Sequence, residues 1–541
     1  MKGSILLMLS WALWALFFFS CNDSGQKQLG TIDFKVTGDQ EAQPVFEEGL
    51  LLLHSFEYED ARELFLQAQE IDPDMAMAYW GEAMSYNHSL WSRQNFAKGT
   101  EALNKLADTP EERVEKAKTE IEKDFIRSVN ILFQSGKPKK ERDQEYADFM
   151  EELFEEYRGN HEVAAFYALS LLGSAPEGRD MRTFEKGAKI AEGILAENAN
   201  HPGALHYLIH SYDDPGHAAL ALKAADSYAE VAPDASHALH MPSHIYVAMG
   251  MWDEVVSSNE ASYQASLNRM DRKDLNNDAR GYHSYHWLLY GYLQQGRIED
   301  ARDLIEDMEV YVEEMPSERA RTHLIYLKST FLAETDLWDD PVAKIPVDME
   351  GLNIADQALE FFVQGMYEYA EKNISGMDTI MDQFFQRIQI EELSKEEASI
   401  TVCGSASGRT ATQTDLNQAM TMLWELRAVQ AQLKDDAENA ERYILKAIEL
   451  ESNTTYSYGP PDIVKPSHEL YAEWLLENLR YDAALDYFSR QLERSPNRTR
   501  TLQGKLKAAE AIGDEPLAKE LKQAIDKNLG LIIEQHLNAV Q

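Results

Sequence analysis

Apolar residues recur at three- and four-residue spacings along most of the chain, the pattern of amphipathic helices that bury one face. This pattern predicts helices over residues 143–156, 161–172, 184–197, 304–314, 317–334, 416–433 and 438–451. A less regular helical hairpin is expected over residues 351–371. No series of segments alternates apolar and polar residues with the period of two that half-buried strands show. The chain is therefore predicted to be all-α.

Two histidine pairs in the middle of the chain repeat at a fixed distance. His206 and His210 recur as His240 and His244, a shift of 34 residues for both members (240 − 206 and 244 − 210). Thirty-four is the period of the tetratricopeptide helix–turn–helix repeat. Residues near the start of the chain also fit the spacings of that repeat: Gly49, Ala61, Phe65, Ala68 and Pro73. The sequence thus predicts a tetratricopeptide-type solenoid of helical hairpins.

This solenoid is expected to span residues 41–530 as one array rather than as separable domains. Breaks in the helical pattern predict irregular loops near residues 336–350, 400–415 and 455–466. Residues 531–541 are expected to form a C-terminal tail.

The histidines in the middle repeats fall at three positions of the repeat. Aligning the repeats on their prolines and turn glycines puts His206, His240 and His286 at position 5, His210 and His244 at position 9, and His237 and His283 at position 2. At about 100° per residue these positions lie within roughly 60° of one another on the helix surface. We expect this face of the first helices to line the concave groove of the solenoid.

Imidazoles four residues apart on one helix can present two nitrogens to one metal ion, and helices about 10 Å apart bring further imidazoles within reach. The predicted metal ligands are His206, His210, His240, His244, His283 and His286. The predicted cofactor is one or more transition-metal ions of the Zn, Cu, Ni or Fe class. Five further residues are expected to support the ligands or to line the groove: His88, Asp213, Asp214, His237 and Tyr290.

Two alternatives to metal binding stay open for these histidines. A polar or anionic organic ligand would satisfy protonated imidazoles, and a hydrogen-bond network would satisfy neutral ones without any ligand. The chain carries 51 Lys and Arg against 93 Asp and Glu, a net charge of −42, which argues against a nucleic-acid partner.

The N-terminus has the features of a bacterial export signal. Lys2 precedes a largely apolar run, and Cys21 directly follows it, as at a lipoprotein cleavage site. We therefore expect a signal peptide over residues 1–20, lipidation of Cys21, a tether over residues 21–40, and attachment to a bacterial membrane in the cell envelope, on the periplasmic or outer-membrane face. A plain signal peptide and an uncleaved anchor helix are the alternatives.

Several strings of the sequence resemble a widespread family of bacterial tetratricopeptide repeat proteins with a His-rich central repeat region. They are residues 76–81 (AMAYWG), 88–91 (HSLW), 206–215 (HYLIHSYDDP) and 238–245 (ALHMPSHI), and His283 with residues 290–294 (YGYLQ). The resemblance spans roughly residues 40–520 and implies the solenoid. It draws attention to six histidines, His88, His206, His210, His240, His244 and His283, and it implies no reaction.

Three functional interpretations follow from the sequence. The first is an exported, lipid-anchored binding or scaffold protein whose groove holds a transition metal. The second is an assembly scaffold that binds a peptide or protein partner without metal. The third is a metal-dependent enzyme of unknown reaction, which is less favoured because no general base can be named beyond the histidines, Asp213 and Asp214.

Overall fold

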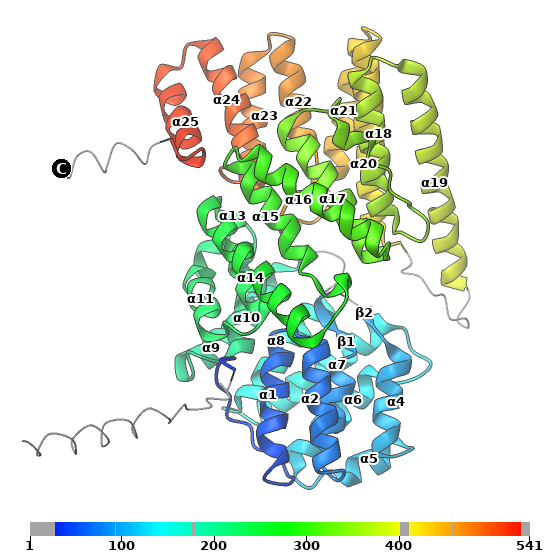
Figure 1. Ribbon diagram of the computed structural model, residues 1–541, viewed down its shortest axis with the longest axis vertical. Coiled ribbons are helices and arrows are strands. Elements are labelled where there is room, and N and C mark those ends of the chain that lie inside the picture. Colours follow the sequence, from blue (N-terminus) through cyan, green and yellow to red (C-terminus); the bar gives the residue numbers. More distant parts are fainter. Residues whose placement is uncertain (1–26, 92, 176–178, 401–410, 457, 532–541) are drawn as a thin grey trace, which may run out of the picture.

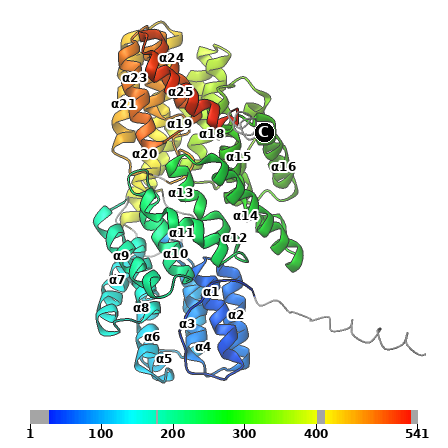
Figure 2. The ribbon, with the colours of Figure 1, turned by 90° about the vertical axis from the view of Figure 1, so that its left-hand side faces the viewer.

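The computed structural model describes residues 27–91, 93–175, 179–400, 411–456 and 458–531, without the side chains of residues 394–400. Within these ranges the chain is an all-α solenoid of antiparallel helix pairs, as the hydrophobic pattern predicts. The helices stack along the long axis of the molecule, with the N-terminal repeats at one end, the histidine-bearing repeats in the middle and the C-terminal repeats at the other end (Figures 1 and 2). None of the helices in these ranges combines the length and the apolar character needed to cross a bilayer.

The N-terminal repeats pack as hairpins whose contact points are small residues. Gly81, for example, lies so close to Phe65 that a Cβ atom on it would be 2.4 Å from the ring. The only strands of the described residues are β1 (Asn87–His88) and β2 (Arg93–Gln94), a two-residue antiparallel pair around the turn η1 (Ser89–Trp91). The helices of this part are α1 (Ala42–His54), α2 (Tyr58–Ile71), α3 (Ala76–Met84), α4 (Phe96–Leu106), α5 (Pro110–Lys116), α6 (Glu120–Leu132), α7 (Lys139–Glu156), α8 (His161–Ser174) and α9 (Met181–Glu197).

The segment before α1 packs on the solenoid from Leu29 onward. Leu29 and Phe34 are buried, and the ring of Phe34 meets that of Phe125 at 5.2 Å. The part of the expected tether that the structure describes therefore lies against the helices. The predicted signal peptide and Cys21 lie outside the described residues.

The middle repeats carry the histidines on the first helix of each pair. Pro242 stands at the first position of α13, and it divides the first helix of the second His-bearing repeat into two short helices. The helices of this part are α10 (Pro202–Tyr212), α11 (Ala218–Val231), α12 (Ser236–His240), α13 (Pro242–Met249), α14 (Trp252–Lys273), η2 (Asn277–Ala279), α15 (Tyr282–Gln294), α16 (Ile298–Glu314) and α17 (Glu318–Thr335).

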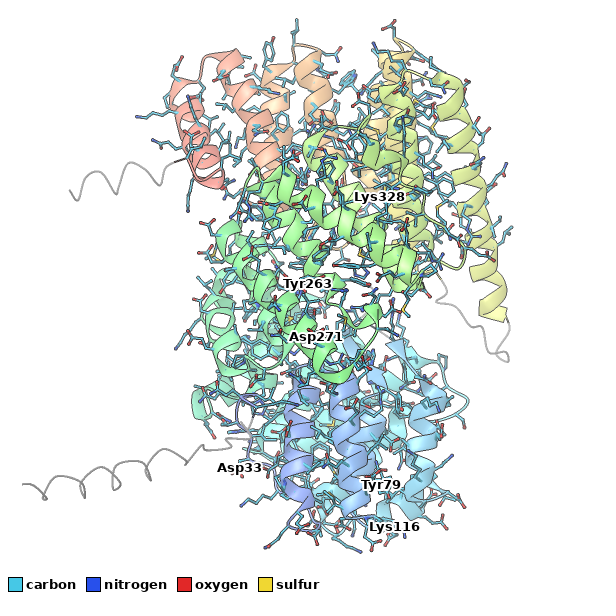
Figure 3. All side chains as sticks on the ribbon, viewed as in Figure 1. Asp33, Tyr79, Lys116, Tyr263, Asp271 and Lys328 are labelled. Carbon is cyan, nitrogen blue, oxygen red and sulfur yellow. The ribbon has the colours of Figure 1, made fainter. Side chains whose placement is uncertain are left out.

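Helix α14 connects the middle of the molecule with the N-terminal repeats. Figure 3 places Tyr263 and Asp271, both on α14, in the middle of the molecule. Toward its C-terminal end, Arg269 and Lys273 donate hydrogen bonds of 2.9 Å each to Asp60 of α2.

The C-terminal repeats follow the turn η3 (Pro341–Lys344). Residues 351–371, predicted to be a hairpin, do not form one: a single helix runs unbroken from Ile354 to Ala370, and Gly365 within it packs against Leu426 instead of forming a turn. Irregular structure lies between residues 336 and 353 and between residues 453 and 466, near two of the three predicted loops. The helices are α18 (Ile354–Ala370), α19 (Ile374–Ile400), α20 (Gln413–Leu433), α21 (Ala437–Ser452), α22 (Ser467–Glu477), α23 (Tyr481–Arg494), α24 (Thr499–Ile512) and α25 (Glu515–Asn528).

Candidate metal centre

The structure gathers the histidines of the middle repeats into one cluster, but it does not leave them on an open groove. His206, His210, His240 and His244 are at most 3% exposed, His237 is half-buried and His283 is exposed. The expectation of a groove-lining face was therefore wrong for the four buried residues. They are covered by the end of α1 and by the link between α21 and α22.

Three of the histidines form a first trio: His206, His210 and His237. One ring nitrogen of each lies within 4.8 Å of the others. His206 Nδ1 donates to the carbonyl of His54 at 2.7 Å, and His210 Nδ1 donates to Asp213 Oδ2 at 3.2 Å. The Nε2 atoms of all three residues are buried without a hydrogen-bond partner among the described residues. For His206 and His210 this nitrogen carries a lone pair, because the proton is on Nδ1.

Three others form a second trio: His240, His244 and His283, whose ligand nitrogens also lie within 4.8 Å of one another. His244 Nδ1 donates to Asp213 Oδ2 at 3.1 Å, and His240 Nδ1 donates to Asn259 Oδ1 at 2.7 Å. The orientation of the Asn259 amide is settled by its Nδ2, which donates to Val255 at 2.8 Å. The Nε2 atoms of His240 and His244 are 3.2 Å apart, so two lone pairs face each other.

The two trios are built by one rule. Each takes the position-5 and position-9 histidines of one first helix and the position-2 histidine of the next first helix. His206, His210 and His237 follow this rule, and so do His240, His244 and His283. A third copy fails because Tyr290 occupies position 9 after His286.

Asp213 orients one imidazole of each trio. Its Oδ2 accepts from both His210 and His244, while its Oδ1 is paired with Arg179. Burial alone would raise the pKa of Asp213, but Arg179 and the two imidazoles hold that pKa well below its usual range. The carboxylate is therefore ionised, and it fixes the proton of both imidazoles on Nδ1.

Four histidines of the two trios, His206, His237, His240 and His244, are neutral near pH 7. Burial lowers the pKa of His206, His237 and His240 well below the ordinary value, and it lowers the pKa of His244 to about 4 even though the bond to Asp213 acts in the opposite direction. Neutral imidazoles are the form that binds metal ions.

Each trio has one aromatic side chain whose ring lies near all three of its imidazoles. The ring of Phe56 lies 4.2, 6.3 and 5.7 Å from those of His206, His210 and His237. Trp287 lies 4.8, 4.6 and 5.5 Å from the rings of the second trio, His240, His244 and His283. Phe56 holds a left-handed backbone conformation, with φ of 56°, which costs a non-glycine residue conformational energy. These two rings form an apolar wall beside each trio.

The link between α21 and α22 covers the cluster through Tyr458 and Gly459. The ring of Tyr458 lies 5.9 Å from His210 and 4.8 Å from His244, one histidine of each trio. A Cβ atom on Gly459 would be 2.3 Å from the ring of Trp287.

A neighbouring group, His54, Glu162 and His201, also has ligand atoms within 4.8 Å of one another, but its hydrogen bonds are complete. Both histidines bond Glu162 through Nε2, at 2.7 and 3.0 Å. His54 Nδ1 is 2.9 Å from the hydroxyl of Tyr207, and His201 Nδ1 accepts from the backbone amide of Ala204. This group is a structural network at the start of α10.

Five of the six predicted ligands thus come together, and the sixth does not. His286 Nε2 is 2.9 Å from Thr330 Oγ1, and its ring packs on Tyr326, outside both trios. His237, predicted only as a supporting residue, completes the first trio.

The three remaining predicted supporting residues make these contacts with side chains outside the trios. His88 stacks on Tyr58 at 3.9 Å, Asp214 bonds His217 Nδ1 at 2.9 Å, and Tyr290 is buried against Trp252.

Several contributors were not predicted from the sequence: Phe56, Arg179, Asn259, Trp287 and Tyr458. Trp287 could have been predicted, since it stands four residues after His283 and therefore lies on the same face of the helix. The others come from distant elements and share no pattern with the histidines.

Comparison with known proteins gives only distant likenesses. No protein-family model matches the chain, and no curated protein does. Among solved structures, a human IFIT1 dimer with PPP-AAAA is 14% identical and covers 88% of both chains at a TM-score of 0.34. Yeast Tom70 is 12% identical over 88% of this chain and 90% of its own, at a TM-score of 0.32. The APC/C hetero-tetramer Cut9–Hcn1 is 13% identical over 90% of each chain, at 0.31.

Identities and TM-scores this low support no conclusion about function, and the fold is established by the helices of this chain itself. The family resemblance seen in the sequence stays a prediction.

Proposed function

We propose that the protein binds transition-metal ions at the two histidine trios. The observation that carries this proposal is the 3.2 Å separation of His240 Nε2 and His244 Nε2, both of which carry lone pairs because Asn259 and Asp213 hold the protons on Nδ1. Two bare lone pairs at this distance repel each other unless a cation lies between them. Nitrogens bound to one tetrahedral zinc at 2.0–2.1 Å are about 3.3 Å apart, so the spacing suits a shared metal ion.

A shared proton is the simplest alternative, and the burial of the site opposes it. A proton between the two rings would make one of them an imidazolium, whereas burial lowers the pKa of both residues. The first trio supports the same conclusion, because its three Nε2 atoms are buried with no partner in the described part of the chain, which is costly for polar atoms that no ligand satisfies.

The donor set favours a particular class of metal. Both trios offer imidazole nitrogen only, which suits Zn, Cu, Ni or Fe and disfavours Mg and Ca. The supporting bonds from Nδ1 to a carbonyl, a carboxylate and an amide oxygen are those that orient metal-binding histidines. Three nitrogens leave one position of a tetrahedral ion for another ligand.

Metal analysis of the untagged protein tests this proposal. The wild type should retain a transition metal through desalting, and its metal-free form should bind zinc in competition with a chelator. His240→Ala should reduce zinc bound at the second trio at least tenfold. His286→Ala is the matched control, because it removes the position-5 histidine that lies outside both trios. Equal zinc binding by wild type and His240→Ala would refute the proposal, and loss in His286→Ala would show that this histidine is a ligand after all.

We further propose that the protein is held at a bacterial membrane through lipid on Cys21, a proposal that rests on the N-terminal sequence alone. Mass spectrometry of the mature chain should show loss of residues 1–20 and added acyl groups, and an unmodified Cys21 would refute it. A protein partner for the solenoid surface also stays a prediction, and pull-down from envelope extracts with the metal-free and metal-loaded protein would test it.

A further inference from the structure

The two trios are in direct contact with each other. The rings of His210 and His244, one from each trio, are 5.1 Å apart, and those of His237 and His240 are 5.9 Å apart. Within each trio the neighbouring rings are separated by similar distances, 5.0 Å for His206 and His210 and 5.1 Å for His240 and His244. The six imidazoles are therefore one continuous cluster rather than two remote sites.

A single oxygen atom joins the two halves of this cluster. Asp213 Oδ2 accepts from His210 Nδ1 at 3.2 Å and from His244 Nδ1 at 3.1 Å. A metal ion on His210 polarises that imidazole and strengthens its bond to Asp213, which changes the acceptor that His244 shares. An ion in one trio thus affects the ligand strength of the other.

The charges of the cluster limit what it can hold. All six ligands are imidazoles, which bring no negative charge, and the carboxylate that bonds two of them, Asp213, is already paired with Arg179. Two divalent ions in this buried region would bring four positive charges that no ligand neutralises, an arrangement that is costly in a low dielectric. A small anion between the ions would relieve this repulsion, and so would ions that carry a single charge.

Copper fits these conditions better than the other metals of its class. Nitrogen sites bind Cu²⁺ more tightly than Zn²⁺, Ni²⁺ or Fe²⁺. Copper also has a singly charged form, which halves the charge that two ions bring into the cluster. Neither trio contains a carboxylate, the ligand that hard ions require.

On the basis of the proposed metal binding, we infer that the two trios form one dinuclear copper centre. One ion is held by His206, His210 and His237, and the other by His240, His244 and His283. Each ion keeps one coordination position, and a small anion such as hydroxide occupies the position that the two Cu²⁺ ions share. Since His283 is exposed while His206 is fully buried, the second trio is the side through which ions and the anion enter.

Copper loading followed by electron paramagnetic resonance tests this inference on the full untagged chain. Metal-free protein is incubated with excess Cu²⁺, desalted and analysed for copper content, and the resonance signal is integrated against a standard. We expect two copper ions per chain. The integrated signal should be less than half of the intensity that two uncoupled Cu²⁺ ions give, because a bridging anion couples the two unpaired electrons. His237→Ala and His283→Ala should each retain one copper, with the full signal of one isolated spin.

His286→Ala is the matched control and should keep both ions and the weakened signal. Two ions per wild-type chain with a full two-spin signal, or a single ion, would overturn the dinuclear centre while leaving metal binding intact. No copper at either trio, with equal uptake by wild type and both trio variants, would overturn the proposed function itself. Far-ultraviolet circular dichroism of every variant shows whether a loss reflects the site or the fold.

Discussion

At the scale of single residues, the acceptors beyond the imidazoles decide what the cluster can do. The carbonyl of His54, the carboxylate of Asp213 and the amide oxygen of Asn259 each take a proton from Nδ1, and so they direct Nε2 lone pairs inward. His54 and His201, whose nitrogens are all bonded, show the opposite outcome with the same side chain. The histidine itself does not define a ligand; its hydrogen-bond partners do.

Asp213 offers the sharpest substitution at this scale. Asp213→Asn removes the charge that polarises His210 and His244, so we expect zinc affinity to fall about 10- to 100-fold. Asp214→Asn is the matched control, because Asp214 bonds His217, outside the trios. Competition with a chromogenic chelator measures both affinities. Equal losses in the two variants would mean that Asp213 has no special role.

The buried histidines also predict how stability depends on pH. In the unfolded chain they titrate near 6.5, whereas burial lowers the pKa of His244 to about 4 and that of His206 and His240 well below the ordinary value. Between about pH 6.5 and pH 4 the unfolded state therefore binds more protons than the folded state. The free energy of unfolding of the metal-free protein should therefore decrease as the pH is lowered from 6.5 to 4, by up to about 1.4 kcal/mol per pH unit for each histidine.

Urea unfolding of the metal-free protein at pH 7, 6 and 5 measures this slope. His244→Gln should reduce the slope of the free energy of unfolding against pH by the contribution of one histidine, up to about 1.4 kcal/mol per pH unit. A free energy of unfolding that does not change between pH 7 and pH 5 would show that these imidazoles are not held neutral by burial.

At the scale of elements, the hydrophobic period and the 34-residue repeat were enough to predict the all-α fold and to place five of the six predicted ligands near one another. The repeat did not show that position 2 of the next helix completes each trio, so His286 was favoured over His237. It also could not show the cover, because Tyr458 meets His210 and Phe56 meets His206 across long stretches of chain. Such contacts depend on how the solenoid curves, which a local sequence period does not encode.

The link that covers the cluster can be tested through Gly459. Gly459→Ala would place a methyl group 2.3 Å from Trp287, so we expect a loss of about 1–3 kcal/mol in stability and weaker metal binding at the second trio. Gly513→Ala is the matched control, since Gly513 also has a positive φ but no atom of the described residues lies within 4 Å of the added Cβ. Thermal unfolding and zinc competition measure the two effects. Equal thermal stability and equal zinc affinity in the two variants would mean that the link between α21 and α22 is not packed tightly against Trp287.

At the scale of the whole molecule, the C-terminal repeats form buried contacts with the middle repeats, and these contacts fix the position of the link between α21 and α22. Arg498, fully buried, joins Glu334 at the end of α17 to Glu469 on α22. Thr499 bonds Gln294 at the end of α15, and Asn497 donates to the carbonyl of Gly250 at 2.8 Å. The cluster is thus enclosed by parts of the chain that are more than 200 residues apart.

Breaking these buried contacts should be far more costly than breaking an exposed ion pair. Arg498→Met leaves two buried carboxylates without their partner, so we expect a loss of about 3–5 kcal/mol in the free energy of unfolding. Arg490→Met is the control, because Arg490 pairs with Asp486 on the surface and should contribute less than about 1 kcal/mol. Chemical unfolding measures both. Equal losses would show that the buried contacts of Arg498 do not stabilise the packing of the C-terminal repeats on the middle ones.

The claim that the trios bind metal is tested most directly by crystals of the protein soaked in zinc or copper, with data collected on both sides of the absorption edge of the metal. Our account predicts anomalous difference peaks within about 2.0–2.1 Å of the Nε2 atoms of His206 and His210 and of those of His240 and His244. Peaks confined to surface carboxylates, with the Nε2 atoms of both trios still without a ligand, would contradict it.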